Sequence, residues 1–282
     1  MLSPGLDTAG TFQLRQHVTP PSVYLDMCEL MDFAHDPALG GRFTRVLLKR
    51  GGTVLLSWFH LLELNRIRSP QTAAEVEEFL ESLDLHVAFL EPLADRVIDN
   101  ENRLMVIPPD RWTSAPHLDD TFLKIAHLNA TPPAVFGFRG LLKHLQTPEM
   151  DALRLQFETA MQKPGQTLAL KRQQFLSDAA YAKSVRALPA GPVIQTPTRY
   201  VVRETFHGLI RDAQKTMSTN EWIDLGHAEV SVSYADYVIL DKAWVEHMRV
   251  VRNRLETAGL LSHFARVYSP GTLAEFWSAF DA

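Results

Sequence analysis

Short apolar runs alternate with longer amphipathic stretches along most of this chain. The runs Ser22–Leu25, Thr53–Ser57 and Val87–Leu90 have the length and composition of buried strands. The stretches between them carry helical periodicity and end at stop signals such as Gly51-Gly52 and Pro70. Strand and helix therefore alternate, which predicts a parallel α/β sheet.

Further strands and helices are predicted in the rest of the chain. Residues 1–21, which glycines and prolines interrupt, are expected to be irregular. Two later strands are predicted at Ala235–Leu240 and His263–Tyr268. The main predicted helices are Pro37–Arg50, Trp58–Arg68, Ser69–Leu83, Arg199–Gln214, Thr219–Val232, Lys242–Ala258 and Leu273–Phe280.

The middle of the chain departs from this alternation. Between about residues 95 and 200, proline pairs such as Pro108-Pro109 interrupt the pattern, and the segments between them are mostly helical. We therefore predict one α/β domain in two parts, residues 22–94 and 201–282. Residues 95–200 would form a helical insertion or cap.

The amino-acid composition excludes several classes of function. A net charge of −5 removes any overall attraction to nucleic acid, so a nucleic-acid enzyme would need local basic groups and a metal ion. The single cysteine, Cys28, excludes an intramolecular disulfide and a zinc site built from several cysteines. No run approaches the roughly 18 apolar residues of a membrane span. The polar first 20 residues lack a signal-peptide core, so we expect a cytoplasmic protein with no membrane partner.

Carboxylates lie at the ends of the predicted strands. Asp26 directly follows the first strand, and Asp241 directly follows a later one. Glu63 lies within an otherwise apolar helix after the second strand, and Asp224 lies on a helix that precedes a strand. Ligands of parallel sheets bind outside the carboxyl ends of the strands. We therefore expect these acids to converge on one site.

The chemistry of such a site follows from its charge. Four carboxylates at one edge repel one another unless a cation is bound. Oxygen ligands favour Mg²⁺ or Mn²⁺ over zinc. A cation of this kind activates water and stabilises the charge of a phosphoryl transition state. The residues therefore indicate metal-assisted hydrolysis of phosphodiester bonds.

Each residue taken singly also has a simpler interpretation. An acid at a strand end commonly caps a helix, and a glutamate on a helix commonly faces solvent. Asp236, which precedes a predicted strand, is most easily explained as a cap. His227, three residues after Asp224, is most easily explained as a structural residue that is hydrogen-bonded to a neighbouring acid.

Four short motifs together resemble those of the PIN-like nuclease domain. In that family the first strand ends on an aspartate, and a glutamate follows on a helix after the second strand. A third acid opens a helix, and a fourth follows a later strand. The resemblance covers about residues 22–68 and 219–281, and it rests on Tyr24-Leu25-Asp26, Leu56-Ser57-Trp58-Phe59-His60-Leu61-Leu62-Glu63, Asp224-Leu225-Gly226-His227 and Ala235-Asp236-Tyr237-Val238-Ile239-Leu240-Asp241.

The resemblance implies a three-layer PIN-like α/β fold with a central, mostly parallel sheet, here with a large helical insertion. It implies Mg²⁺- or Mn²⁺-dependent endonuclease activity on RNA, with structured DNA as the other substrate of the family. The catalytic residues and metal ligands would be Asp26, Glu63, Asp224 and Asp241. Asp236 matches a further acid of the family whose role varies, and we count it among the predicted metal ligands.

Basic residues beside these acids are candidates for contacts with substrate. Lys242 directly follows Asp241, and Arg66 lies near the end of the Glu63 helix. Phosphate groups are bound mainly by lysine and arginine. The resemblance also leaves room for a homodimer and for an antitoxin or regulatory protein as partner.

The sequence departs from the family pattern at two places. Leu240 precedes the last acid, where the family often has Thr or Ser, and Met27-Cys28-Glu29 follow the first acid, where it often has Asn. The loss of such polar groups can weaken metal binding. The alternative is therefore a catalytically inactive PIN-like scaffold that binds RNA or a protein partner.

Two other enzyme classes are disfavoured. An Asp-x-Asp phosphatase needs a second acid where Cys28 stands. Neither of the glycine-rich motifs of nucleotide-binding enzymes occurs.

Overall fold

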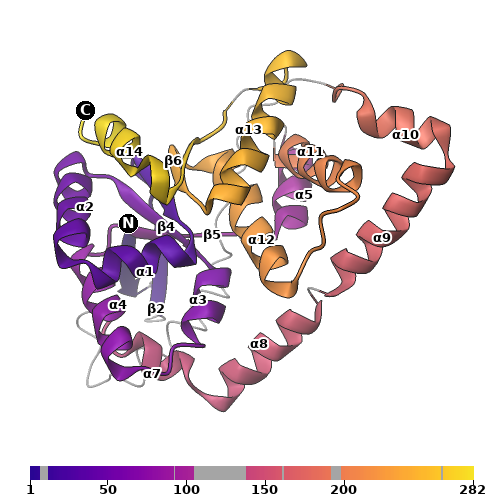
Figure 1. Cartoon of the computed structure of the whole chain (residues 1–282). Helices are drawn as coiled ribbons and strands as arrows, with labels where there is room; N and C mark the ends of the chain where they lie inside the picture. The colour runs from indigo at the N-terminus through magenta and orange to yellow at the C-terminus, as the bar shows by residue number, and fades with distance from the viewer. Residues whose placement is uncertain (7–11, 92, 105–137, 161, 192–197, 262) are drawn as a thin grey trace.

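A five-stranded parallel sheet forms the centre of the molecule, with strand order β5-β4-β3-β6-β7. The computed structural model describes residues 1–6, 12–91, 93–104, 138–160, 162–191, 198–261 and 263–282 (Figure 1). The parallel α/β sheet that the sequence predicts is thus confirmed. Its strands are β3 (Ser22–Leu25), β4 (Thr53–Ser57), β5 (Val87–Leu90), β6 (Tyr237–Ile239) and β7 (Arg266–Tyr268).

Helices cover both faces of this sheet and make three layers. Successive residues of a strand point to opposite faces, so Leu25 packs into one apolar core and Tyr24 into the other. The first core is covered by α1 (Met27–His35), α2 (Pro37–Arg50), α4 (Pro70–Ser82) and α14 (Leu273–Phe280). The second is covered by α5 (Ala94–Leu104), α11 (Thr198–Arg211), α12 (Thr219–Tyr234) and α13 (Lys242–Thr257).

The helix α1 was not expected from the sequence. It ends at Asp36, and the side chain of Asp36 then caps α2 by accepting hydrogen bonds from the N–H groups of Ala38 and Leu39 at 2.9 and 3.0 Å. Pro37 suits the first position of a helix because it has no N–H to leave unpaired. One capping residue therefore separates two consecutive helices, of which the apolar pattern revealed only the second.

The prediction that residues 1–21 are irregular is wrong. An antiparallel pair, β1 (Leu2–Leu6) and β2 (Phe12–Gln16), lies within this segment. Leu2 is buried in the first core, and its N–H donates to the carbonyl of Leu85 at 2.8 Å. These strands depend on contacts with distant residues, which local sequence does not show.

Helices also occupy the described part of the predicted insertion. Beyond α5 they are α7 (Leu141–Leu145), α8 (Pro148–Ala160), α9 (Gln162–Ser177) and α10 (Ala179–Arg186), which follow one another along one side of the molecule (Figure 1). Residues 105–137 of that segment lie outside the described residues, and the division into two domain parts and an insertion stays a prediction. Among the described helices, none is long and apolar enough to cross a membrane.

Gly40→Ala should destabilise the protein by about 1–3 kcal/mol. A Cβ at this position would lie 2.3 Å from the carbonyl oxygen of Phe33, where α2 approaches α1. Gly41→Ala is the matched control, because nothing lies within 4 Å of its added Cβ. Alanine should there stabilise the helix by up to about 1 kcal/mol. Urea unfolding of both variants measures the difference, and equal effects would contradict the close contact.

A candidate acidic site at the carboxyl edge of the sheet

Two of the predicted acids flank the point where the sheet topology reverses. β3 leads into α1 on one face, and β6 leads into α13 on the other. Ligand sites of parallel sheets lie at such switch points. Asp26 follows β3 and Asp241 follows β6, and the backbone N–H of Asp241 donates to Oδ2 of Asp26 at 3.1 Å. The predicted convergence of these two acids is therefore confirmed.

Both aspartates also cap helices. Oδ1 of Asp26 accepts a hydrogen bond from the N–H of Glu29 at 3.0 Å, and Oδ1 of Asp241 accepts one from the N–H of Trp244 at 2.9 Å. Helix N-termini stabilise negative charge. The simpler capping interpretation is thus correct for both residues. It does not exclude metal binding, since a carboxylate has about four lone-pair sites.

Glu63 is held by a histidine from another helix. It lies on α3 (Trp58–Leu64), and Nε2–H of His227 on α12 donates to Oε2 of Glu63 at 2.9 Å. The prediction that His227 is hydrogen-bonded to an acid is confirmed. The His227 side chain is 1% exposed and that of Glu63 is 19% exposed. The Glu63 carboxylate is therefore held on its buried side by His227, while part of it remains exposed to solvent.

A buried chain of hydrogen bonds continues behind this pair. The hydroxyl of Tyr24 donates to Nδ1 of His227 and accepts from the hydroxyl of Ser57 at 3.0 Å. The N–H of Ser57 donates to Nδ1 of His60 at 3.0 Å, and Nε2–H of His60 donates to the carbonyl of Leu25 at 2.7 Å. These partners assign the Nε2–H tautomer to both histidines. Each donor thus meets an acceptor.

Burial determines the protonation states of Tyr24 and His60 in this hydrogen-bond network. It raises the pKa of the Tyr24 hydroxyl well above its ordinary value and lowers that of His60 well below. Both groups are therefore neutral at neutral pH. Sequence reasoning did not select Tyr24, Ser57 or His60. A signal was present, because each is a polar residue within an apolar segment and so needs a buried partner.

The fourth predicted acid, Asp224, interacts electrostatically with the other three. Burial raises its pKa to about 7; His227 opposes this shift, and the charges of Glu63, Asp241 and Asp26 add to it. Burial also raises the pKa of Asp26, against hydrogen bonds that favour its charged form. The four predicted acids therefore lie close enough for their charges to affect the ionisation of Asp224, and a hydrogen bond joins two of them, Asp26 and Asp241.

A fifth carboxyl group, which sequence reasoning did not select, lies beside them. Glu29 is buried on α1. Burial, followed by the charges of Asp26, Asp32 and Asp241, raises its pKa to about 8. Glu29 is thus mostly protonated at neutral pH and can donate a hydrogen bond.

The prediction that Asp236 is a ligand in this site is wrong. Asp236 precedes β6, and its Oδ2 accepts hydrogen bonds from the N–H and hydroxyl of Ser22 at 2.7 and 3.0 Å. Ser22 begins β3, so this pair lies at the amino edge of the sheet, opposite Asp26 and Asp241. Asp236 joins two strand starts, and its role is structural.

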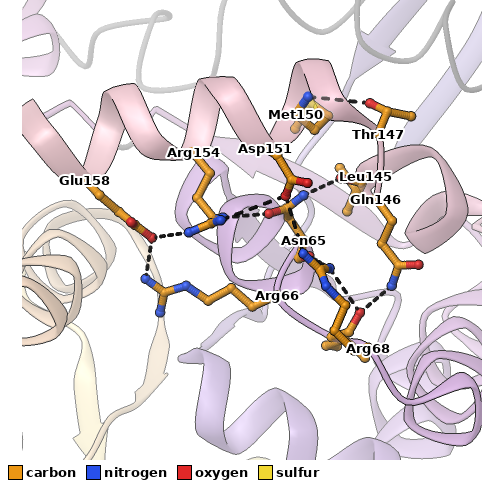
Figure 2. Close-up of polar contacts among 11 residues, drawn as sticks. Asn65, Arg66, Arg68, Leu145, Gln146, Thr147, Met150, Asp151, Arg154 and Glu158 are labelled. Atoms are coloured by element: carbon orange, nitrogen blue, oxygen red, sulfur yellow. Dashed lines mark hydrogen bonds and ion pairs between the residues drawn. The ribbon is translucent and has the colours of Figure 1, made fainter.

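The two predicted substrate-binding residues differ in their surroundings. Lys242 is exposed and begins α13. Arg66 donates from Nη2 to Oε1 of Glu158 on α8 at 2.7 Å, and the same oxygen accepts from Arg154 at 2.7 Å (Figure 2). Arg154 in turn donates to Oδ1 of Asn65 at 2.8 Å. Arg66 therefore helps to join α3 to α8, and a phosphate contact would compete with Glu158.

The four predicted ligands have the atom type and the charge that a hard divalent cation prefers. All four predicted ligands are carboxylates, which Mg²⁺ and Mn²⁺ prefer. Burial is the main cause of the raised pKa values of Asp26 and Asp224, and the charges of neighbouring carboxylates add to it; a cation would offset that added repulsion. Within the described ranges, however, no three His, Cys, Asp or Glu side chains form a ready-made ligand group. Metal binding would therefore require some of these side chains to reorient.

Comparisons with known proteins add no identification. No family model matches the sequence, and no curated protein or solved structure gives a significant match. The resemblance to PIN-like nucleases stays a prediction from short motifs.

In EDTA, the free energy of unfolding should fall as the pH rises from about 5 to about 8. The unfolded chain releases its carboxyl protons at ordinary pKa values near 4. In the folded protein, Asp224 and Glu29 keep theirs until about pH 7 and 8. The folded state thus binds more protons across this range, so a rising pH favours unfolding.

Glu29→Gln should flatten this pH dependence, because glutamine does not titrate. Glu78→Gln, the same change at an exposed position of α4, is the control and should leave the slope unchanged. Urea unfolding at a series of pH values gives the slopes. An unaltered slope in Glu29→Gln would show that its carboxyl is not held protonated.

Proposed function

We propose that this protein is a metal-dependent endonuclease with a PIN-like domain and that its substrate is RNA. The observation that carries the proposal is the contact between Asp241 and Asp26 at the switch point of the sheet. Glu63 and Asp224 act electrostatically on the same region. The repulsion between these acids opposes their proximity, and a bound cation would offset it.

Asp26, Glu63, Asp224 and Asp241 would hold Mg²⁺ or Mn²⁺. The ion would supply positive charge at the reacting phosphate and lower the pKa of a water molecule. The chain itself orients the ligands. His227 fixes the Glu63 carboxylate through Nε2–H, and Tyr24 fixes the orientation and tautomer of His227. Both are positioning residues in this proposal.

Lys242 is the better candidate for a phosphate contact. It directly follows Asp241 and is exposed, whereas Arg66 is paired with Glu158. A lysine at this place would offset the repulsion between the acids and the RNA backbone.

A non-catalytic scaffold that binds RNA or a protein partner is the second candidate. The observation in its favour is that three of the acids already have structural partners. Asp26 and Asp241 cap helices, and Glu63 is bonded to His227. The two candidates differ in whether a divalent cation binds and whether RNA is cut.

Asp241→Asn should lower the rate of RNA cleavage by about 100-fold or more, because a ligand loses its charge. Asparagine keeps the side-chain oxygen that caps α13, so the fold should persist. The assay uses a mixed pool of single-stranded and structured RNA with Mn²⁺, Mg²⁺ or EDTA. Asp32→Asn, at an exposed position of α1, is the matched control and should cleave like wild type.

Metal binding can be measured independently of cleavage. Mn²⁺ should raise the melting temperature of wild type and Asp32→Asn, but not that of Asp241→Asn. A melting shift without cleavage would favour the scaffold that binds a cation. If Mn²⁺ produced neither cleavage nor a melting shift, the nuclease proposal would be wrong.

A further inference from the structure

A pocket of about 490 Å³ lies on the other side of α12 from the acidic site. The volume is within the range of small-molecule sites. On α12, Trp222, Gly226 and Glu229 share one helical face and line the pocket, whereas Asp224 lies on the opposite face. The other walls come from α3, α5, α9 and α11, and the side chains that matter most are Phe59, Phe206, Trp222, Asp95, Lys163 and Glu229.

Glu229 is the unusual residue of this pocket. Its side chain forms part of the wall, and none of the described residues makes a hydrogen bond to its carboxyl group. Burial, and then the charge of Asp95, raise its pKa to about 8. The side chain is half-buried, so the carboxyl group is open to the pocket and has capacity for a ligand that forms a hydrogen bond or ion pair with it.

The remaining lining indicates the class of ligand. Phe59, Phe206 and Trp222 provide apolar surface and aromatic rings, which attract cations over their faces. Among the lining residues, two carboxyl groups, Asp95 and Glu229, stand against one ammonium group, that of Lys163. The raised pKa keeps Glu229 mostly protonated near neutral pH, so the charges of Asp95 and Lys163 offset each other before a ligand binds. An ammonium group beside Glu229 would stabilise the carboxylate form and release its proton, so the pocket can accept positive charge on an apolar body.

We propose that this pocket binds an organic cation, namely an ammonium group carried by an apolar ring or chain. Glu229 and Asp95 pair with the ammonium group, and the aromatic side chains bury the body of the ligand. The proposal does not rest on nuclease activity, because none of the four predicted metal ligands lines the pocket. The alternative ligand is a neutral nucleobase stacked on the aromatic side chains, and the test must distinguish it from an organic cation.

Phenethylamine and 2-phenylethanol are matched probes, because they share a ring and chain length but differ in charge. Isothermal titration of the full chain in EDTA should show at least tenfold tighter binding of phenethylamine. In Glu229→Gln this preference should fall by about tenfold or more, as expected for a lost charge-assisted hydrogen bond. Glu78→Gln, exposed on α4 and remote from the pocket, should bind like wild type.

Three results would overturn the proposal. The first is equal affinity for the two probes, and the second is no binding of phenethylamine at about 10 mM, where even a weak site should be occupied. The third is tighter binding of adenosine or cytidine than of phenethylamine, which would indicate a base pocket. Melting temperatures of the variants exclude misfolding as the cause of a lost preference.

Discussion

The acidic edge depends on one hydrogen bond, from the backbone of Asp241 to the carboxylate of Asp26. It joins residues 215 positions apart and thereby links β3 and α1 to β6 and α13. The Asp26 carboxylate lies at the starts of both helices, which favour negative charge there. This placement explains how a protein with net charge −5 can hold several acids together before any cation is bound.

A buried network of hydrogen-bonded side chains holds Glu63 in place at the same edge of the sheet. It takes a carbonyl and a tyrosine from β3, a serine from β4 and histidines from α3 and α12. Because every donor has an acceptor, loss of one member leaves a buried group unpaired. The position of Glu63 is therefore set by the packing of two strands and two helices, and it does not depend on a bound ligand.

The sequence predicted those parts of the fold that local pattern determines. The bounds of β3, β4 and β5 agree with the predicted runs, because buried strands of a parallel sheet are continuous apolar segments. The meeting of Asp26 and Asp241 also followed, since the carboxyl ends of parallel strands share an edge. The β1–β2 pair and the Tyr24–His227 bond depend on distant contacts that no local pattern encodes. Asp236 was misplaced because it precedes its strand and so lies at the opposite edge.

Phe59 of α3 and the helix α12 lie between the acidic site and the second pocket, and Gly226 allows them to pack closely together. A Cβ on Gly226 would lie 2.4 Å from the ring of Phe59, so α12 approaches α3 closely only because residue 226 has no side chain. The Phe59 ring lines the second pocket, and its centroid lies 5.3 Å from that of His227, which holds Glu63. Closely packed interiors transmit displacement. A ligand that moved the Phe59 ring would therefore also act on the Glu63–His227 bond, although it would touch none of the four acids.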